Sequence, residues 1–346
     1  MRGRTASLIL GLAGLALAGV LYMIARAGAS EDSVAGPAQP ARAPALQRRT
    51  LLSASTTGGD TDGEPVHGEA APEISLADPG ASPREPLRLA VTTGSKQPVT
   101  LELRIKVASA IGELPAPEVI MPPIRLMTTV TVTAVTESND RHAELAIDRA
   151  LVLEEPGVMP GMARAMRENI SRLDGLRGFL VVSERGIVRE ADFDAPEDLP
   201  QELRETVEGL RQAMVQLTVP LPVEPIGDGA SWTVSSGRAR PDGVKIEQTT
   251  IYRLKSREGG ALVLGYEGMQ TGEPTVLDAP NAPEGVRVEL VSLTTEGHGE
   301  ATMTLDRLLP QKAKLGVEST MRTRVTFAGV HQRMRLEMAV GIEVLP

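Results

Sequence analysis

The sequence predicts an α+β protein, predominantly antiparallel β, in which about a dozen strands form a curved sheet or half-barrel with two mid-chain helices packed on its concave face. Two observations carry this prediction. Apolar and polar residues alternate over most of 99–153 and 230–345, which is typical of half-buried antiparallel strands. Between these regions apolar residues recur at three and four positions, as on one face of a helix. The helices need an apolar surface, and the inner face of the sheet offers one.

The first strands are predicted from strict alternation. In residues 99–109 (VTLELRIKVAS) valine, leucine or isoleucine occupies every second position from 99 to 107. Residues 124–136 and 142–153 repeat the pattern on either side of the turn residues Ser138, Asn139 and Asp140. The proline-rich segment 112–123 cannot pair as a central strand, because proline donates no backbone N–H, so we expect an edge loop there.

Two helices are predicted in the middle of the chain. The first ends at Gly175, and its apolar face carries Met159, Met162, Met166, Ile170 and Leu173. The second has an apolar stripe made of Leu199, Leu203, Val207, Leu210, Met214 and Leu217. Asp198 can cap this helix, Pro200 fits its first turn, and Pro220 and Pro222 stop it. Residues 178–194 between the helices read as a hairpin that turns near 184–186.

The C-terminal part returns to alternation with period two. Strands are expected near 230–237, 243–255, 260–268, 286–294, 298–306, 314–327 and 331–345. The last two are heavily charged on one side, where we expect Arg322, Arg324, Arg333, Arg335 and Glu337 to face outward. A charge ladder of this kind is usually a solvated sheet face.

The N-terminal region predicts the location of the protein. Residues 1–27 carry Arg2 and Arg4 and then an uncharged run long enough, about 27 Å as a helix over 7–24, to span a bilayer. They are interpreted as a single-pass signal-anchor in the inner membrane or as a cleaved signal peptide. Residues 28–85, rich in alanine, proline and glycine, predict a disordered linker with a span of about 40–45 Å. Residues 86–346 would then form a β-rich extracytoplasmic domain on the periplasmic side of a bacterial cell envelope.

Composition excludes several function classes. The formal charge of −9 and the lack of basic clusters argue against nucleic-acid binding. The absence of cysteine excludes disulfides, thiolate metal sites and cysteine catalysis. No nucleotide-binding or serine-hydrolase motif is present. We therefore predict no catalytic, cofactor-binding or metal residues and no cofactor.

Several residues are of types that can form sites, but their spacing favours structural roles. The histidines His67, His142, His298 and His331 lack metal-ligand spacing. Met159, Met162 and Met166 resemble soft copper ligands, but methionine at helical spacing is normally core filler. The acidic group Asp192, Asp194, Glu197 and Asp198 precedes a helix, where negative charge complements the helix dipole. Gly227, Asp228 and Gly229 form a turn rather than an anion cradle, because no helix begins after them.

The segment around the single tryptophan resembles that of a known family. Leu221, Pro222, Pro225, Gly227, Asp228, Ser231 and Trp232 resemble the LPxxPVxxGDSW segment of an uncharacterised family of bacterial secreted and envelope proteins, and the similarity extends over about residues 87–346. This chain departs from the pattern by carrying Gly229 and Ala230 before the serine. The resemblance implies the same strand–helix–strand order. It suggests no activity, because none is assigned to the family. Physically, Trp232 is predicted to be a buried apolar plug whose indole N–H needs one partner.

The expected function is therefore binding rather than catalysis. The large sheet with an aliphatic face resembles, in outline, half-barrel lipoprotein and lipid carriers. We expect a non-enzymatic envelope protein that binds an apolar ligand, a lipid or an envelope protein partner. A structural or adaptor protein without a ligand is the first alternative, and a hydrolase using Asp192 and Asp194 is the second.

Overall fold

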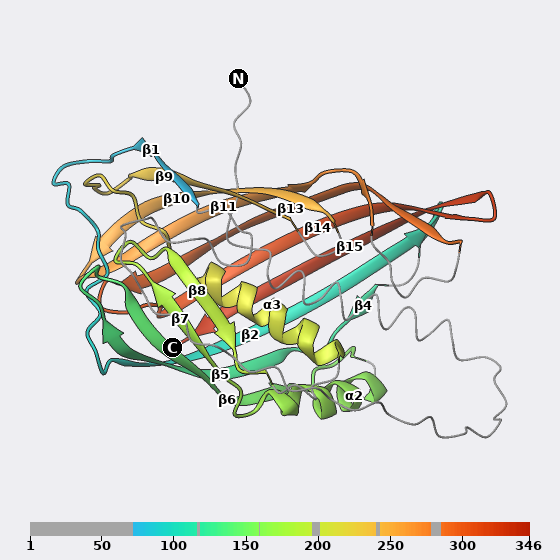
Figure 1. Cartoon of the computed structure of the whole chain (residues 1–346), viewed down its shortest axis with the longest axis horizontal. Helices are drawn as coiled ribbons and strands as arrows, with labels where there is room; N and C mark the ends of the chain where they lie inside the picture. The colour runs from blue at the N-terminus through green and yellow to red at the C-terminus, as the bar shows by residue number, and fades with distance from the viewer. Residues whose placement is uncertain (1–71, 116–117, 159, 196–200, 240–242, 278–284) are drawn as a thin grey trace, which may run out of the picture.

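A computed structural model describes residues 72–115, 118–158, 160–195, 201–239, 243–277 and 285–346. These residues form one large, open antiparallel sheet with two α-helices, which confirms the predicted fold class. The sheet curls, and one helix lies inside the curl (Figure 1). Fifteen strands are present in the described part of the chain, a few more than expected.

The elements follow the chain in this order. The strands are β1 (Glu73–Asp78), β2 (Lys96–Ile111), β3 (Leu114–Pro115), β4 (Val119–Ile120), β5 (Ile124–Val135), β6 (Arg141–Val152), β7 (Arg177–Val182), β8 (Val188–Phe193), β9 (Ser231–Ala239), β10 (Lys245–Glu258), β11 (Ala261–Gly272), β12 (Thr275–Val276), β13 (Arg287–Thr304), β14 (Lys312–Phe327) and β15 (Val330–Leu345). The helices are α2 (Pro160–Ile170), the short 3-10 helix η2 (Ser171–Leu173) and α3 (Gln201–Leu217).

Strand order in the sheet is β1-β9-β10-β11-β13-β14-β15-β2-β5-β6-β7-β8. β12 adds to β13, while β3 and β4 add to β2. The proline-rich segment thus contributes only two-residue strands, as its prolines require. Neighbouring strands pair mainly as hairpins, and β15 joins β2 across a long gap in sequence, with Val340 opposite Ile105.

Two predicted boundaries are wrong. The segments 286–294 and 298–306 are a single strand, β13, which runs through Gly297 and Gly299 without a turn. Gly299 leaves space for a neighbour, because a Cβ there would lie 2.3 Å from the Tyr266 hydroxyl oxygen. In addition, β1 lies within the segment 28–85 that was expected to be disordered linker, so the described sheet begins at Glu73, paired with β9.

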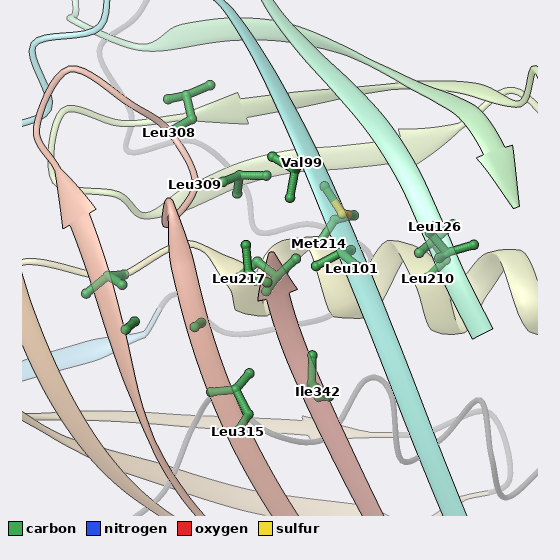
Figure 2. Close-up of a cluster of buried hydrophobic side chains, with 14 of the residues drawn as sticks. Val99, Leu101, Leu126, Leu210, Met214, Leu217, Leu308, Leu309, Leu315 and Ile342 are labelled. Carbon is green, nitrogen blue, oxygen red and sulfur yellow. The ribbon is translucent and has the colours of Figure 1, made fainter. Parts of the chain in front are cut away.

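The second predicted helix fills the hollow of the sheet. α3 returns along the inner face, and Leu210, Met214 and Leu217 point from it toward β2, β5, β14 and β15 (Figure 2). These three side chains are buried. The side chain of Leu203 and the whole of Leu199 lie outside the described part of the chain. α2 packs beside β6, with Ala163 and Ile170 buried and Met162 and Met166 half-buried against the same core.

One end of the curled sheet is closed by the segment that leads from β1 to β2. Leu87, Leu89 and Val91 are buried there. The backbone of this segment donates hydrogen bonds to the loops that connect α3 to β9, β7 to β8 and β13 to β14. These bonds run from Glu85 N to Ile226 O (3.0 Å), from Leu89 N to Glu184 O (2.7 Å) and from Ala90 N to Leu305 O (2.6 Å). Leu308 and Leu309 fill the same end, and their backbone N–H groups donate to Gln97 Oε1. The hollow is therefore sealed at this end by connections from both halves of the chain.

Neither helix in the described part of the chain is both long and apolar enough to cross a membrane. The predicted signal-anchor or signal peptide, residues 1–27, and the linker up to residue 71 lie outside the described residues.

An ion cluster on the outer face ties β2 to β5. Glu102 is buried, and its carboxylate accepts hydrogen bonds from Arg125 Nη2 (2.7 Å) and Arg104 Nη2 (2.7 Å). Arg104 also donates to Glu155 (2.7 Å). The hydrogen bond from Arg125, followed by that from Arg104, lowers the pKa of Glu102, because both bonds favour the charged carboxylate.

This cluster predicts a stability difference that depends on pH. A carboxylate with a pKa lowered by folding stabilises the fold above its unfolded pKa, and this contribution is lost as pH falls through the folded pKa. Near neutral pH, Glu102→Gln should lower the free energy of unfolding by about 1–3 kcal/mol, the usual worth of hydrogen bonds to charged groups. Urea unfolding of both proteins between pH 3 and pH 7 should show the two curves converging on the acid side. Equal differences at both ends of the range would contradict the assignment.

Candidate functional site

Trp232 has the structural role predicted for it. Its side chain is 0% exposed, and the indole N–H donates to Pro220 O (2.8 Å). The ring stacks on Tyr252 with centroids 5.4 Å apart, and Tyr252 lies 6.4 Å from Tyr266. These rings from three neighbouring strands line the closed end of the hollow.

The glycine turn before Trp232 is packed against another backbone segment. A Cβ at Gly227 would lie 1.6 Å from Ala81 O, so only glycine fits. Gly227 N donates to Pro79 O (2.8 Å), and Asp228 forms an ion pair with Arg257 (3.6 Å). The turn thus packs against the segment that directly follows β1 and holds β1 next to β9.

The other weighed residues are not brought together. His142, His298 and His331 are exposed and lie on three different strands, β6, β13 and β15. No group of potential metal ligands occurs among the described residues. Asp192 and Asp194 are exposed at the end of β8, and the Asp192 carboxylate accepts a hydrogen bond from Phe193 N. His67, Met159, Glu197 and Asp198 lie outside the described residues.

A row of polar side chains crosses the inner face of the sheet. Ser236, Gln248, Gln270, Thr295 and Ser319 are consecutive register partners on β9, β10, β11, β13 and β14. Register partners in a sheet point to the same face. Gln248 lies two residues from the buried Ile246 and from the buried Thr250 on its strand, so the three side chains share the inner face. We call these five residues the polar row.

The polar row separates two apolar clusters. On the side of the closed end lies the main core, which includes Val234, Tyr252 and Val317. On the other side lies a small second cluster, formed by Val244, Ile246, Leu290 and Leu293 with Leu277 and Met321 packed against it. Along these strands, the inner face of the sheet is therefore apolar near the closed end, polar at the row and apolar again beyond it.

Gln270 is the member of the row with an unused donor. Its side chain is 2% exposed, and its Nε2 has no hydrogen-bond partner within the described structure. The neighbouring Thr295 Oγ1 is instead bonded to Ser319 Oγ (2.7 Å). A buried amide left without a partner costs about 1–3 kcal/mol, so an unpaired donor between apolar clusters marks a place where a ligand acceptor would fit.

The tyrosine hydroxyls near the row do not titrate in the physiological range. Burial raises the pKa of Tyr252 far above its usual value, and the Thr250 hydroxyl offsets this only in part. Burial likewise raises the pKa of Tyr266. These groups therefore act as neutral hydrogen-bonding partners.

Two cavities are shown on the described structure, and both lie on the outer side of the sheet. The larger, ≈ 570 Å³, lies between the end of β2 and the β14–β15 hairpin, and Arg322, Arg324, Arg333 and Arg335 are among the residues that line it. The smaller, ≈ 270 Å³, lies over Gly316 and Gly341 beside Arg104, Lys106 and His298. No residue of α2 or α3 lines either of them. Where α3 packs on β2 and β5, the hollow is filled by side chains (Figure 2).

Sequence reasoning missed the polar row. The signal is present in each strand, as a glutamine, serine or threonine at a position where alternation calls for an apolar residue. A single polar residue on an inner face is unremarkable, and only the register aligns the five of them.

Comparisons with known proteins leave the family open. No family model matches this chain, and no curated protein matches it. Among solved structures, an outer membrane channel from Pseudomonas putida F1 is similar over 75% of this chain and 98% of that chain, with 6% identity and a TM-score of 0.14. This match is weak and assigns no family or function. The resemblance to the uncharacterised envelope family therefore stays a prediction.

Proposed function

We propose that this chain is a non-enzymatic protein of the bacterial envelope that binds a lipid or a similar apolar ligand along the inner face of its sheet. The observation that carries the proposal is the unpaired Nε2 of Gln270 between two apolar clusters. An acyl ligand with an ester or amide carbonyl would accept this hydrogen bond and lay apolar portions on both sides of the row. A plain hydrocarbon would leave the donor unpaired.

The sequence supports the proposed location. The uncharged run that follows Arg2 and Arg4 is long enough to hold the chain in the inner membrane with the sheet on the periplasmic side. A ligand drawn from that membrane would be a phospholipid, which carries ester carbonyls between its acyl chains and its headgroup.

The proposal predicts a specific effect of Gln270→Leu. With the full chain reconstituted in lipid nanodiscs, a phospholipid with a photoreactive acyl chain should crosslink to peptides of β11 and β13. The variant should reduce this crosslinking up to about tenfold, the worth of one hydrogen bond. Removing the unpaired amide should also raise the free energy of unfolding of the lipid-free chain by about 1–3 kcal/mol.

Gln97→Leu is the matched control. Gln97 is equally buried, at the closed end, and its Nε2 is also unpaired within the described structure, but its Oε1 accepts hydrogen bonds from Leu308 N and Leu309 N. The control should lose stability and keep the crosslinks to β11 and β13. Crosslinks confined to residues before Glu73, or equal yields from wild type and Gln270→Leu, would disprove ligand binding at the polar row.

A second candidate is an adaptor that binds no ligand. It is favoured by α3, which fills the hollow beside β2 and β5 as tightly as a core helix. This candidate predicts that the purified full chain carries no lipid by native mass spectrometry and that its melting temperature is unchanged by phospholipid.

A further inference from the structure

The end of the sheet farthest from the closed end carries four arginines on its outer face. They are Arg322 and Arg324 on β14 and Arg333 and Arg335 on β15. All four are exposed, and they line the larger cavity together with residues that include Ala110, Gly112, Glu113 and Pro115. The β14–β15 turn projects beyond the rest of the sheet (Figure 1). We call this end, from Arg322 to Arg335 with the adjoining β2–β3 turn, the arginine tip.

The arginines face one another in like-charged pairs. Arg322 is the direct register partner of Arg335, and Arg324 is the partner of Arg333. Like charges directly opposite each other destabilise a sheet, so the arrangement does not serve the fold. Acidic groups, either of the chain itself or of an external anion, would relieve the repulsion.

Internal acids neutralise only part of this charge. Arg324 pairs with Glu289 (3.3 Å) and Arg335 with Glu337 (3.4 Å). Within the described part of the chain, Arg322 and Arg333 have no ion pair. Two guanidinium groups, each able to bind a phosphate through two N–H bonds, are therefore left facing solvent.

Large apolar side chains surround the arginines. Leu114 is 77% exposed, Val330 69% and Phe327 54%, and Ile111 and Val291 are also exposed at the same end. These residues come from the β2–β3 turn, the β14–β15 turn and β13. An aromatic and aliphatic tip rimmed by arginines matches the boundary between acyl chains and headgroups of a bilayer.

We propose that the arginine tip docks on a membrane surface rich in anionic phospholipid, with the arginines on headgroup phosphates and Phe327, Val330 and Leu114 entering the acyl boundary. Charge favours this occupant, because the chain as a whole carries −9 and an anionic surface would repel it elsewhere. The tip would also bring Leu290 of the second apolar cluster, opposite Thr323 in register, close to the lipid.

The lack of cysteine in the chain makes a direct test possible. The full chain carrying Ala328→Cys in the β14–β15 turn is labelled with an environment-sensitive dye and reconstituted in vesicles. In vesicles with a third phosphatidylglycerol the dye emission should shift to the blue, and in pure phosphatidylcholine it should not. Salt at about 1 M should abolish the shift, since the Debye length is then about 3 Å.

Two variants separate charge from apolar contact. Arg322→Glu with Arg333→Glu should lower the equilibrium constant for docking of the tip at least about tenfold, given roughly fivefold in affinity per charge, and so remove most of the shift in vesicles with a third phosphatidylglycerol. Phe327→Ser with Val330→Ser should remove the blue shift. Lys96→Glu with Lys312→Glu is the matched control, because both lysines are exposed at the ends of β2 and β14 farthest from the tip and have no ion pair within the described part of the chain; it should leave the shift unchanged.

Three outcomes would overturn the proposal. These are an equal shift in neutral vesicles, an effect of the lysine control as large as that of the arginine pair, and a shift that appears only when an envelope protein extract is added. Because the readout is the tip and not Gln270, failure here leaves ligand binding at the polar row untouched.

Discussion

Replacing Trp232 with alanine should lower the free energy of unfolding by about 3–5 kcal/mol, the range for large aromatic residues removed from a core. Trp232 is fully buried, stacks on Tyr252 and donates its indole N–H to Pro220 O. Aromatic residues make up only 2% of the chain, so few side chains large enough to refill the space are present. Pro220 O would also lose its partner where α3 joins β9. Urea unfolding followed by far-ultraviolet circular dichroism measures the change.

Trp232→Phe tests which part of the tryptophan matters. Phenylalanine keeps a ring against Tyr252 but loses the hydrogen bond and some volume, so we expect about half the loss seen with alanine. Equal losses for both variants would show that the bond to Pro220 dominates. A loss below about 1 kcal/mol for alanine would contradict the packing described here.

Met214→Ala in α3 should cost about 2–5 kcal/mol, because it opens a cavity in the filled hollow. Met214 is buried and lies beside Val99 and Leu101 of β2 (Figure 2). Met214→Leu conserves volume and should cost less than about 1.5 kcal/mol. Both are measured by the same urea unfolding.

Met214→Ala also distinguishes between the two proposed functions, ligand binding and an adaptor role. If a lipid enters the hollow by moving α3 aside, weakening the contact of α3 with β2 should increase lipid crosslinking to the inner face. If the protein is an adaptor, Met214→Ala should lose stability with no gain in crosslinking. A gain with Met214→Leu as well would point to a general loosening rather than to α3.

Much of the fold could be predicted from the sequence because each strand has one buried face. Alternation located β5, β6 and β14 to within two residues at each end and the central part of β2, and the stripe that includes Leu210 and Leu217 located α3. β13 was divided wrongly because Gly297 and Gly299 resemble a turn. Glycine is required at position 299 because the Tyr266 hydroxyl of the neighbouring strand occupies the space where a side chain would lie.

The candidate sites were less predictable because they depend on register. Polar residues such as Gln270 and Thr295 belong to strands that are each unremarkable, and only their pairing forms a row. Arg322 and Arg335 were expected to face outward, and they do, but the sequence could not show that they are directly opposed. β1 was missed because six residues in an alanine- and proline-rich segment carry too weak a pattern to separate from linker.

The position of β15 in the sheet bears on how the chain matures. β15 is synthesised after every other strand described, yet it is the strand that joins β14 to β2. Until it arrives, β9–β14 and β2–β8 are separate sheets with long unpaired edges, which readily add foreign strands. A nascent chain halted before Val330 is therefore exposed to aggregation along both edges, and chaperone capture should peak at that length.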